Sequence, residues 1–111
     1  MRVVLVCGGR NYQDAQRVYQ ELAAENPERV VTGGASGADY FAERWAREAG
    51  CELNVYHADW RKHGRSAGPK RNQQMLTKAK PTKVLAFPGG NGTTDMVRRA
   101  KKAGIPVREV V

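Results

Sequence analysis

Three short runs of apolar residues divide the chain, and each ends in a glycine-rich turn that leads into a helical pattern. With their turns they read VVLVCGGR (3–10), RVVTGGASGAD (29–39) and KVLAFPGGNGTTD (83–95). An uninterrupted run of Val, Leu and Ile predicts a strand covered on both faces, because a strand with one wet face alternates apolar and polar residues. We therefore expect buried parallel strands whose turns meet at one edge of a sheet.

Strand patterns alternate with helical ones along the whole chain, and this order predicts an α/β fold. We expect one domain over residues 1–111, a three-layer Rossmann-like α/β domain whose mainly parallel, five-stranded sheet has helices on both faces. Pro106 places the last strand at an edge of the sheet. The predicted elements are a strand from residue 3, a helix at 12–25, strands at 29–32 and 51–57 around a helix at 38–49, a helix from 69, a strand at 84–87, a helix after 92 and a strand at 105–110.

The ends of these helices are marked by capping residues. Asn11 or Asp14 caps the first helix, and Ser36 with Asp39 resembles a capping box before the second. Gly50 ends the second helix. Residues 58–72 show no clean period, so we expect an irregular loop until Pro69 starts the next helix.

Charge is divided unevenly along the 111 residues, whose net charge is +8. Residues 1–60 carry 6 basic and 9 acidic side chains, whereas residues 61–111 carry 13 basic and 2 acidic ones. This asymmetry favours an anionic partner, either a phosphorylated small molecule or nucleic acid. A basic, solvated face that aids solubility is the alternative.

Cys7 and Cys51 lie alone in or beside apolar runs, so we expect free buried thiols and not a disulfide. No apolar stretch approaches the roughly 20 residues of a membrane span, and no cleavage pattern follows the first strand. We therefore expect a cytoplasmic protein without a membrane partner.

The glycine turns are the strongest candidates for a binding site, because glycine lets a ligand approach the backbone and the next helix offers free N–H groups. The alternative is that the turns need only flexibility. Arg10 can clamp a phosphate with two hydrogen bonds. A threonine of the third turn can both cap the helix and contact a phosphate oxygen. The candidate ligand-binding residues in these turns are Gly8, Gly9, Arg10, Gly33, Gly34, Ser36, Gly37, Pro88, Gly89, Gly90, Gly92, Thr93 and Thr94.

Other polar residues allow more than one interpretation. Asp39 either contacts a ribose hydroxyl or only caps its helix. Asp59 and Trp60 either hold a base, through a carboxylate and a stacking ring, or Trp60 closes the core under the loop. Asp95 is a general base, an electrostatic stabiliser or a residue that satisfies the helix dipole. Lys70, Arg71 and Asn72 lie at a predicted helix start. The positive charges of Lys70 and Arg71 oppose the helix dipole there, and an anionic ligand would offset this cost.

His57, Asp59 and His63 lack a fixed metal-ligand spacing, so we expect neither a metal nor another cofactor. The turns also lack the lysine of a Walker loop and the spacing of the dinucleotide fingerprint.

Four motifs together resemble the SLOG superfamily, and within it the small YspA/YpsA-related proteins. They are GGRNYQD, TGGASGAD, ADWRKHGRSAGPKRNQQM and FPGGNGTTDM, and they cover nearly the whole chain. The resemblance implies a Rossmann-like nucleotide binder for ligands such as ADP-ribose or a nucleoside monophosphate.

Two related families suggest more specific functions. The Lonely Guy phosphoribohydrolases hydrolyse the N-glycosidic bond of a nucleoside monophosphate, and their motifs make Arg71 and Asp95 the catalytic candidates here. Met96 occupies the position of their glutamate, and Asp95 comes one residue earlier. The DprA type of DNA-processing protein binds single strands, so a nucleic-acid-binding accessory protein is the alternative function. Relatives of this fold often pair, which makes a homodimer plausible.

Overall fold

The computed structural model describes residues 1–111 and contains one sheet of five parallel strands in the order β3-β2-β1-β4-β5. This confirms the predicted sheet. β5 follows Pro106 and lies at an edge, as expected, with β3 at the other edge. The strands are β1 (Val3–Cys7), β2 (Arg29–Thr32), β3 (Glu52–Val55), β4 (Lys83–Ala86) and β5 (Val107–Glu109).

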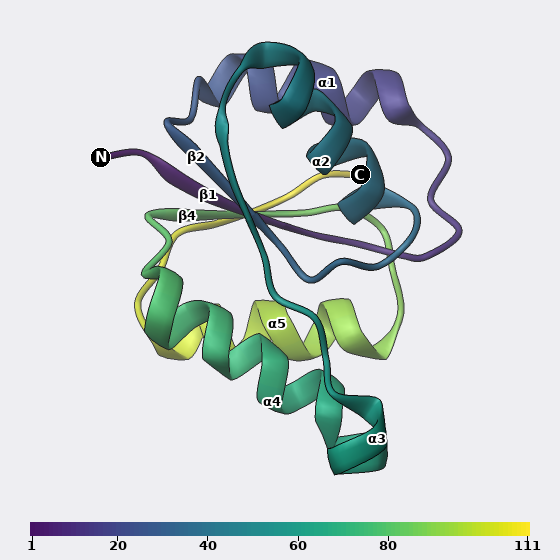
Figure 1. The fold of residues 1–111 in the computed structure, drawn as a ribbon. Coiled ribbons are helices and arrows are strands. Elements are labelled where there is room, and N and C mark those ends of the chain that lie inside the picture. The colour runs from purple at the N-terminus through teal and green to yellow at the C-terminus, as the bar shows by residue number, and fades with distance from the viewer.

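Helices cover both faces of the sheet (Figure 1). On one face lie α1 (Ala15–Glu25) and α2 (Ala38–Ala49), and on the other lie α4 (Ala67–Gln74) and α5 (Asn91–Lys102). A π-helical turn, η2 (Met75–Ala79), prolongs α4. None of the helices combines the length and the apolar character that crossing a membrane requires.

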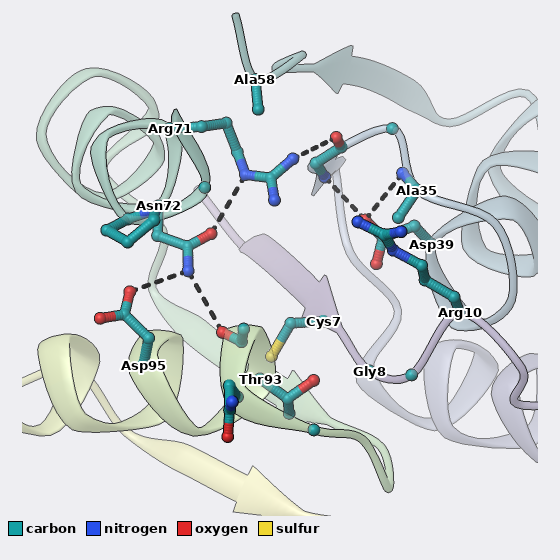
Figure 2. Close-up of a pocket in the computed structure, with 18 of the residues that line it drawn as sticks. Cys7, Gly8, Arg10, Ala35, Asp39, Ala58, Arg71, Asn72, Thr93 and Asp95 are labelled. Carbon is teal, nitrogen blue, oxygen red and sulfur yellow. Dashed lines mark hydrogen bonds between the residues drawn. The ribbon is translucent and has the colours of Figure 1, made fainter. Parts of the chain in front are cut away.

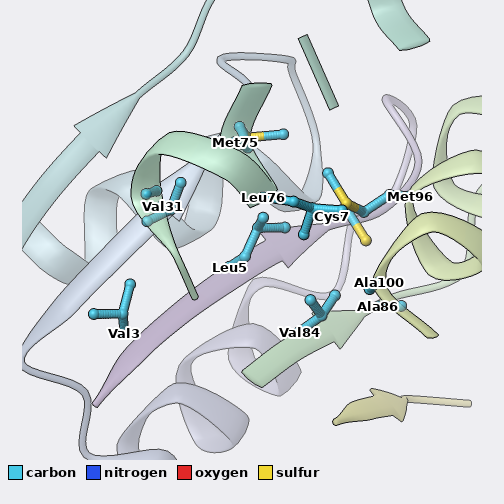
Figure 3. Packing of buried hydrophobic residues seen from close by; sticks show 11 residues of the cluster. Val3, Leu5, Cys7, Val31, Met75, Leu76, Val84, Ala86, Met96 and Ala100 are labelled. Carbon is cyan, nitrogen blue, oxygen red and sulfur yellow. The ribbon is translucent and has the colours of Figure 1, made fainter. Parts of the chain in front are cut away.

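The core consists of two layers because β1 is buried on both faces. Val3, Leu5 and Cys7 face α4, η2 and α5, and they pack with Met75 and Met96 (Figure 3). The intervening Val4 and Val6 face α1 and α2. This alternation explains why the strand reads as one continuous apolar run.

Several predicted boundaries were wrong. The first helix starts at Ala15, not at residue 12, because the Asp14 carboxylate caps it by accepting a hydrogen bond from the N–H of Arg17. Strand β3 is shorter than residues 51–57, and α5 starts at Asn91, before Gly92. Gly50 ends α2 in the left-handed conformation, as expected.

The segment predicted as an irregular loop contains a short helix. Asp59 caps α3 (Trp60–His63), which continues through a 3₁₀ turn, η1 (Gly64–Ser66), into α4. Pro69 is therefore the third residue of α4 and does not start it. A four-residue helix without buried residues leaves no periodic apolar pattern in the sequence, which is why the prediction failed.

Candidate functional site

The three glycine turns lie next to one another at the carboxyl edge of the sheet. The N–H of Gly9 donates to the Pro88 carbonyl at 2.9 Å, which joins the turns after β1 and β4. The Ser36 hydroxyl donates to the Arg10 carbonyl at 3.2 Å, which joins the turns after β1 and β2. Neighbouring strands β1 and β4 lead to helices on opposite faces, and ligands of open α/β sheets bind at such a position.

A cavity of about 810 Å³ opens between these turns, α3 and the starts of α4 and α5. Its volume lies within the range of about 300–1,000 Å³ that is usual for small-molecule sites. The predicted site residues that line it are Gly8, Gly9, Arg10, Gly33, Gly34, Ser36, Asp39, Trp60, Arg71, Asn72, Gly90, Gly92, Thr93 and Asp95.

Six other predicted site residues do not line this cavity. Gly37 lies behind it, against the carbonyls of Gly9 and Arg10. Asp59 is exposed and caps α3, and Lys70 is exposed beside His63 and not at a helix start. The remaining three, Pro88, Gly89 and Thr94, line a separate cavity of about 310 Å³ between α5 and the end of the chain.

Sequence reasoning missed Arg65 and Asn91, which also line the large cavity. Arg65 belongs to a basic stretch in which nothing distinguishes it from Arg61 or Lys62. Asn91 had a usable signal, because it lies inside the PGGNGTT turn.

Asp39 fills the turn after β2 with a negative charge. Its Oδ2 accepts hydrogen bonds from the N–H groups of Gly33 (3.0 Å) and Ala35 (3.3 Å). The predicted capping box is therefore wrong: the N-cap residue of α2 is Gly37, at a φ of 75°, and Ser36 bonds to Arg10 instead. The amides of Gly33 and Ala35 are occupied by Asp39, so this turn does not offer these two groups to a phosphate.

The pKa of Asp39 is raised to about 6, because its burial outweighs the two hydrogen bonds from Ala35 and Gly33 and the positive charge of Arg71. Its second carboxylate oxygen, Oδ1, makes no hydrogen bond within the protein. The residue thus presents one acceptor atom to the cavity.

Arg71 is held by its neighbours on two sides (Figure 2). Its guanidinium donates to the Gly33 carbonyl through Nη1 and to Oδ1 of the buried Asn72 through Nε at 3.1 Å. Burial lowers the pKa of Arg71, although the charge of Asp39 acts in the opposite direction. A guanidinium remains charged at any ordinary pH, so the cavity contains a fixed cation.

Asp95 lies across from Arg71 and joins the same network. Its Oδ2 accepts hydrogen bonds from Asn72 (3.0 Å) and Arg99 (2.8 Å), and its Oδ1 accepts one from Arg98 (2.8 Å). Burial alone would raise its pKa, but the hydrogen bonds from Asn72 and Arg99 and the nearby positive charges lower it below the ordinary value. Asp95 is therefore an ionised carboxylate, which suits charge stabilisation better than proton transfer.

The start of α5 has free hydrogen-bond donors. The first main-chain bond of this helix runs from the N–H of Thr94 to the Gly90 carbonyl, and no side chain caps it. The N–H groups of Asn91, Gly92 and Thr93 consequently have no partner within the protein, and these three residues line the cavity. The predicted threonine cap is absent, since the Thr94 hydroxyl donates to Gly90 within the same turn.

The structure also shows the state of the two cysteines and the exposure of Trp60. Cys7 and Cys51 are free, as predicted, but only Cys7 is buried, whereas Cys51 is half-buried. Burial raises the pKa of Cys7 to about 12, so this thiol is protonated at neutral pH. Trp60 is 50% exposed and does not close the core. No group of three His, Cys, Asp or Glu side chains is placed to hold a metal ion.

Comparison with known proteins decides the family. The model of the YspA, cpYpsA-related SLOG family matches residues 2–63. The chain belongs to this family. It is also 43% identical to the Gene 61 protein of Mycobacterium phage D29 over 119 aligned positions, which cover 96% of this chain and 94% of that protein.

Solved structures share the fold. DprA from Streptococcus pneumoniae superimposes with a TM-score of 0.82 at 19% identity, over 100% of this chain and 50% of DprA. The protein TM1055 superimposes with a TM-score of 0.75 at 20% identity, over 96% of this chain and 72% of TM1055. The Moco carrier protein from Chlamydomonas reinhardtii superimposes with a TM-score of 0.64 at 18% identity, over 98% of this chain and 75% of that protein. The SLOG-type, Rossmann-like fold expected from the sequence is thereby confirmed.

Proposed function

We propose that the protein binds a nucleotide, or a nucleotide-derived phosphorylated molecule, in the large cavity at the carboxyl edge of its sheet. One observation carries this proposal: unpartnered N–H groups at the start of α5 share the cavity with the guanidinium groups of Arg10, Arg65 and Arg71. None of these three arginines forms an ion pair within the protein.

The anionic group of the ligand is best accommodated at the start of α5. Its first turn contains no acidic residue, and the helix dipole adds to the free amides of Asn91, Gly92 and Thr93. The turn after β2, by contrast, is occupied by Asp39. Its free Oδ1 suits a donor such as a sugar hydroxyl, so phosphate and sugar would contact different turns.

Hydrolysis of an N-glycosidic bond is a narrower form of the proposal. The ionised Asp95 would stabilise positive charge on the ribose as the base leaves, and water would add to the anomeric carbon to give free base and ribose 5-phosphate. The carboxylate already has three partners, so binding without turnover is the form that we favour. Asp95→Asn separates the two, because only hydrolysis requires the charge: a loss of turnover of nucleoside monophosphates with binding retained supports an enzyme.

The binding proposal is tested by thermal shift with AMP, ADP-ribose, NAD and ribose 5-phosphate, since a ligand that binds only the folded state raises the melting temperature. Arg65→Ala should reduce the shift, whereas Arg61→Ala should leave it unchanged. These two exposed arginines come from the same segment, but only Arg65 lines the cavity. No shift with any of the four compounds at millimolar concentration would reject the proposal.

A further inference from the structure

Trp60 is an exposed aromatic side chain on the wall of the proposed binding cavity. It is one of four large hydrophobic residues that remain exposed, together with Met1, Tyr40 and Val111, and it alone among them lines the large cavity. Exposure of a large aromatic residue to water is unfavourable, so a ligand that covers Trp60 gains apolar burial.

The backbone that carries this ring is well supported. Asp59 caps α3 by accepting a hydrogen bond from the N–H of Lys62 at 3.1 Å, and the Ser66 hydroxyl donates to the His63 carbonyl at 2.8 Å. The ring itself lies against α4 at Gly68, where a Cβ would be 3.4 Å from its Cη2. Because Gly68 has no side chain and also lines the cavity, the indole approaches α4 closely at the cavity wall.

The anion-binding groups lie on other elements. The free N–H groups belong to α5, and Arg71 belongs to α4, whereas Trp60 belongs to α3. A ligand that contacts both the α5 amides and the indole therefore needs an anionic end and a flat, apolar end. Indole rings stack on nucleobases of any kind, since every base has a π face.

We propose that Trp60 is the stacking surface for an aromatic base, so that the ligand class is a nucleotide and not a sugar phosphate. This inference rests on the proposed function, which requires only the anionic end. Arg65 lies in η1, the 3₁₀ turn that follows α3. It also lines the cavity and adds a second planar group close in sequence to Trp60.

The experiment compares four nucleoside monophosphates (AMP, GMP, CMP and UMP) with ribose 5-phosphate by calorimetry. Wild-type protein should bind at least one nucleotide more tightly than ribose 5-phosphate. Trp60→Leu should weaken the binding of that nucleotide about 5- to 150-fold, the range for loss of one base–aromatic contact. The affinity for ribose 5-phosphate should stay unchanged. Trp60→Phe should recover part of the affinity because it keeps an aromatic ring.

Fluorescence gives an independent measurement because the chain has two tryptophans. Trp45 packs against the core on the α1–α2 face and does not line the cavity. In Trp45→Phe only Trp60 emits, and the nucleotide should quench it; in Trp60→Leu only Trp45 emits, and quenching should be lost. Melting curves establish that each variant is folded.

The outcomes separate the two proposals. If ribose 5-phosphate binds as tightly as every nucleotide, or if a folded Trp60→Leu binds nucleotides as the wild type does, the stacking proposal is wrong and the anion site remains. If neither class of compound binds to the wild type, the proposed function itself is rejected.

Discussion

The side-chain amide of Asn72 donates a 3.0 Å hydrogen bond to the carboxylate of Asp95, and so links α4 to α5 beside the cavity. The same amide group donates to the Gly92 carbonyl at 3.2 Å, and its oxygen accepts from Arg71. One buried side chain thus fixes the positions of both residues that the Lonely Guy motifs suggest as catalytic.

Replacement of Asn72 by alanine should therefore affect both stability and binding. Three hydrogen bonds are lost at a site that is only 4% exposed, and we expect the free energy of unfolding to fall by about 2–3 kcal/mol. Affinity for a phosphorylated ligand should fall about tenfold, equivalent to about 1.4 kcal/mol, because Arg71 loses a fixed partner. Urea denaturation and calorimetry measure the two effects.

The neighbouring Lys70→Ala serves as the control. Lys70 is exposed and lies outside the cavity, so both quantities should stay close to those of the wild type. Equal effects of the two substitutions would contradict the role given to Asn72.

The raised pKa of Asp39 predicts that stability depends on pH. The folded protein holds this proton up to about pH 6, whereas the ordinary value of the carboxyl is 3.8, so the folded state binds more protons between these values. The free energy of unfolding should then decrease as the pH rises from about 4 to 6, by up to about 3 kcal/mol from this group, and level off above.

Asp39→Asn removes this contribution and keeps an oxygen that can accept from Gly33 and Ala35. The measurement is the difference in unfolding free energy between wild type and variant across this pH range. A difference that stays constant with pH would show that Asp39 titrates in the folded protein as it does in the unfolded chain.

Gly37 and Gly92 should respond oppositely to alanine. At Gly37 the φ of 75° is strained for any side chain, and a Cβ would clash with the carbonyl oxygens of Gly9 and Arg10. We expect Gly37→Ala to lower the free energy of unfolding by about 3 kcal/mol or more, or to prevent folding. A Cβ at Gly92 meets nothing within 4 Å. The free energy of unfolding of Gly92→Ala should therefore lie within about 0.5 kcal/mol of the wild type or slightly above it, and chemical denaturation measures this difference.

The alternative function, nucleic-acid binding by the basic face of α5, makes a different prediction. Arg98 and Arg99 share the single carboxylate of Asp95, and Lys101 is paired with Glu109, so two carboxylates offset part of the positive charge of this face. Arg98→Ala combined with Lys102→Glu should leave nucleotide affinity within about twofold of the wild type. Loss of single-strand binding in this variant, together with a steep dependence of the wild type on salt, would favour nucleic acid as the partner.

The fold was predictable because its central strands are buried on both faces. Val3 to Val6 alternate between the two core layers, and every position is apolar, which distinguishes such a strand from a surface one. The turns were equally visible, since glycine was required where Gly9 and Pro88 approach each other closely.

Side-chain partners that depend on the path of the backbone were not predictable. Asp39 has the spacing of a helix cap, yet it bonds to the turn before the helix because Gly37 redirects the chain. Arg65 and Lys70 look alike in the sequence, and only the course of α3 and η1 places Arg65 at the cavity and Lys70 outside it. Short helices without an apolar face carry no periodic signal from which this course could be derived.

Because a carboxylate of the protein itself occupies the glycine turn after β2, the two sides of the cavity are chemically unequal. A molecule with a phosphate at each end would gain at α5 and lose at Asp39, whereas a molecule with unlike ends can satisfy both in a single orientation. Under the proposed function, Asp39 therefore determines which end of the ligand lies beside the turn after β2.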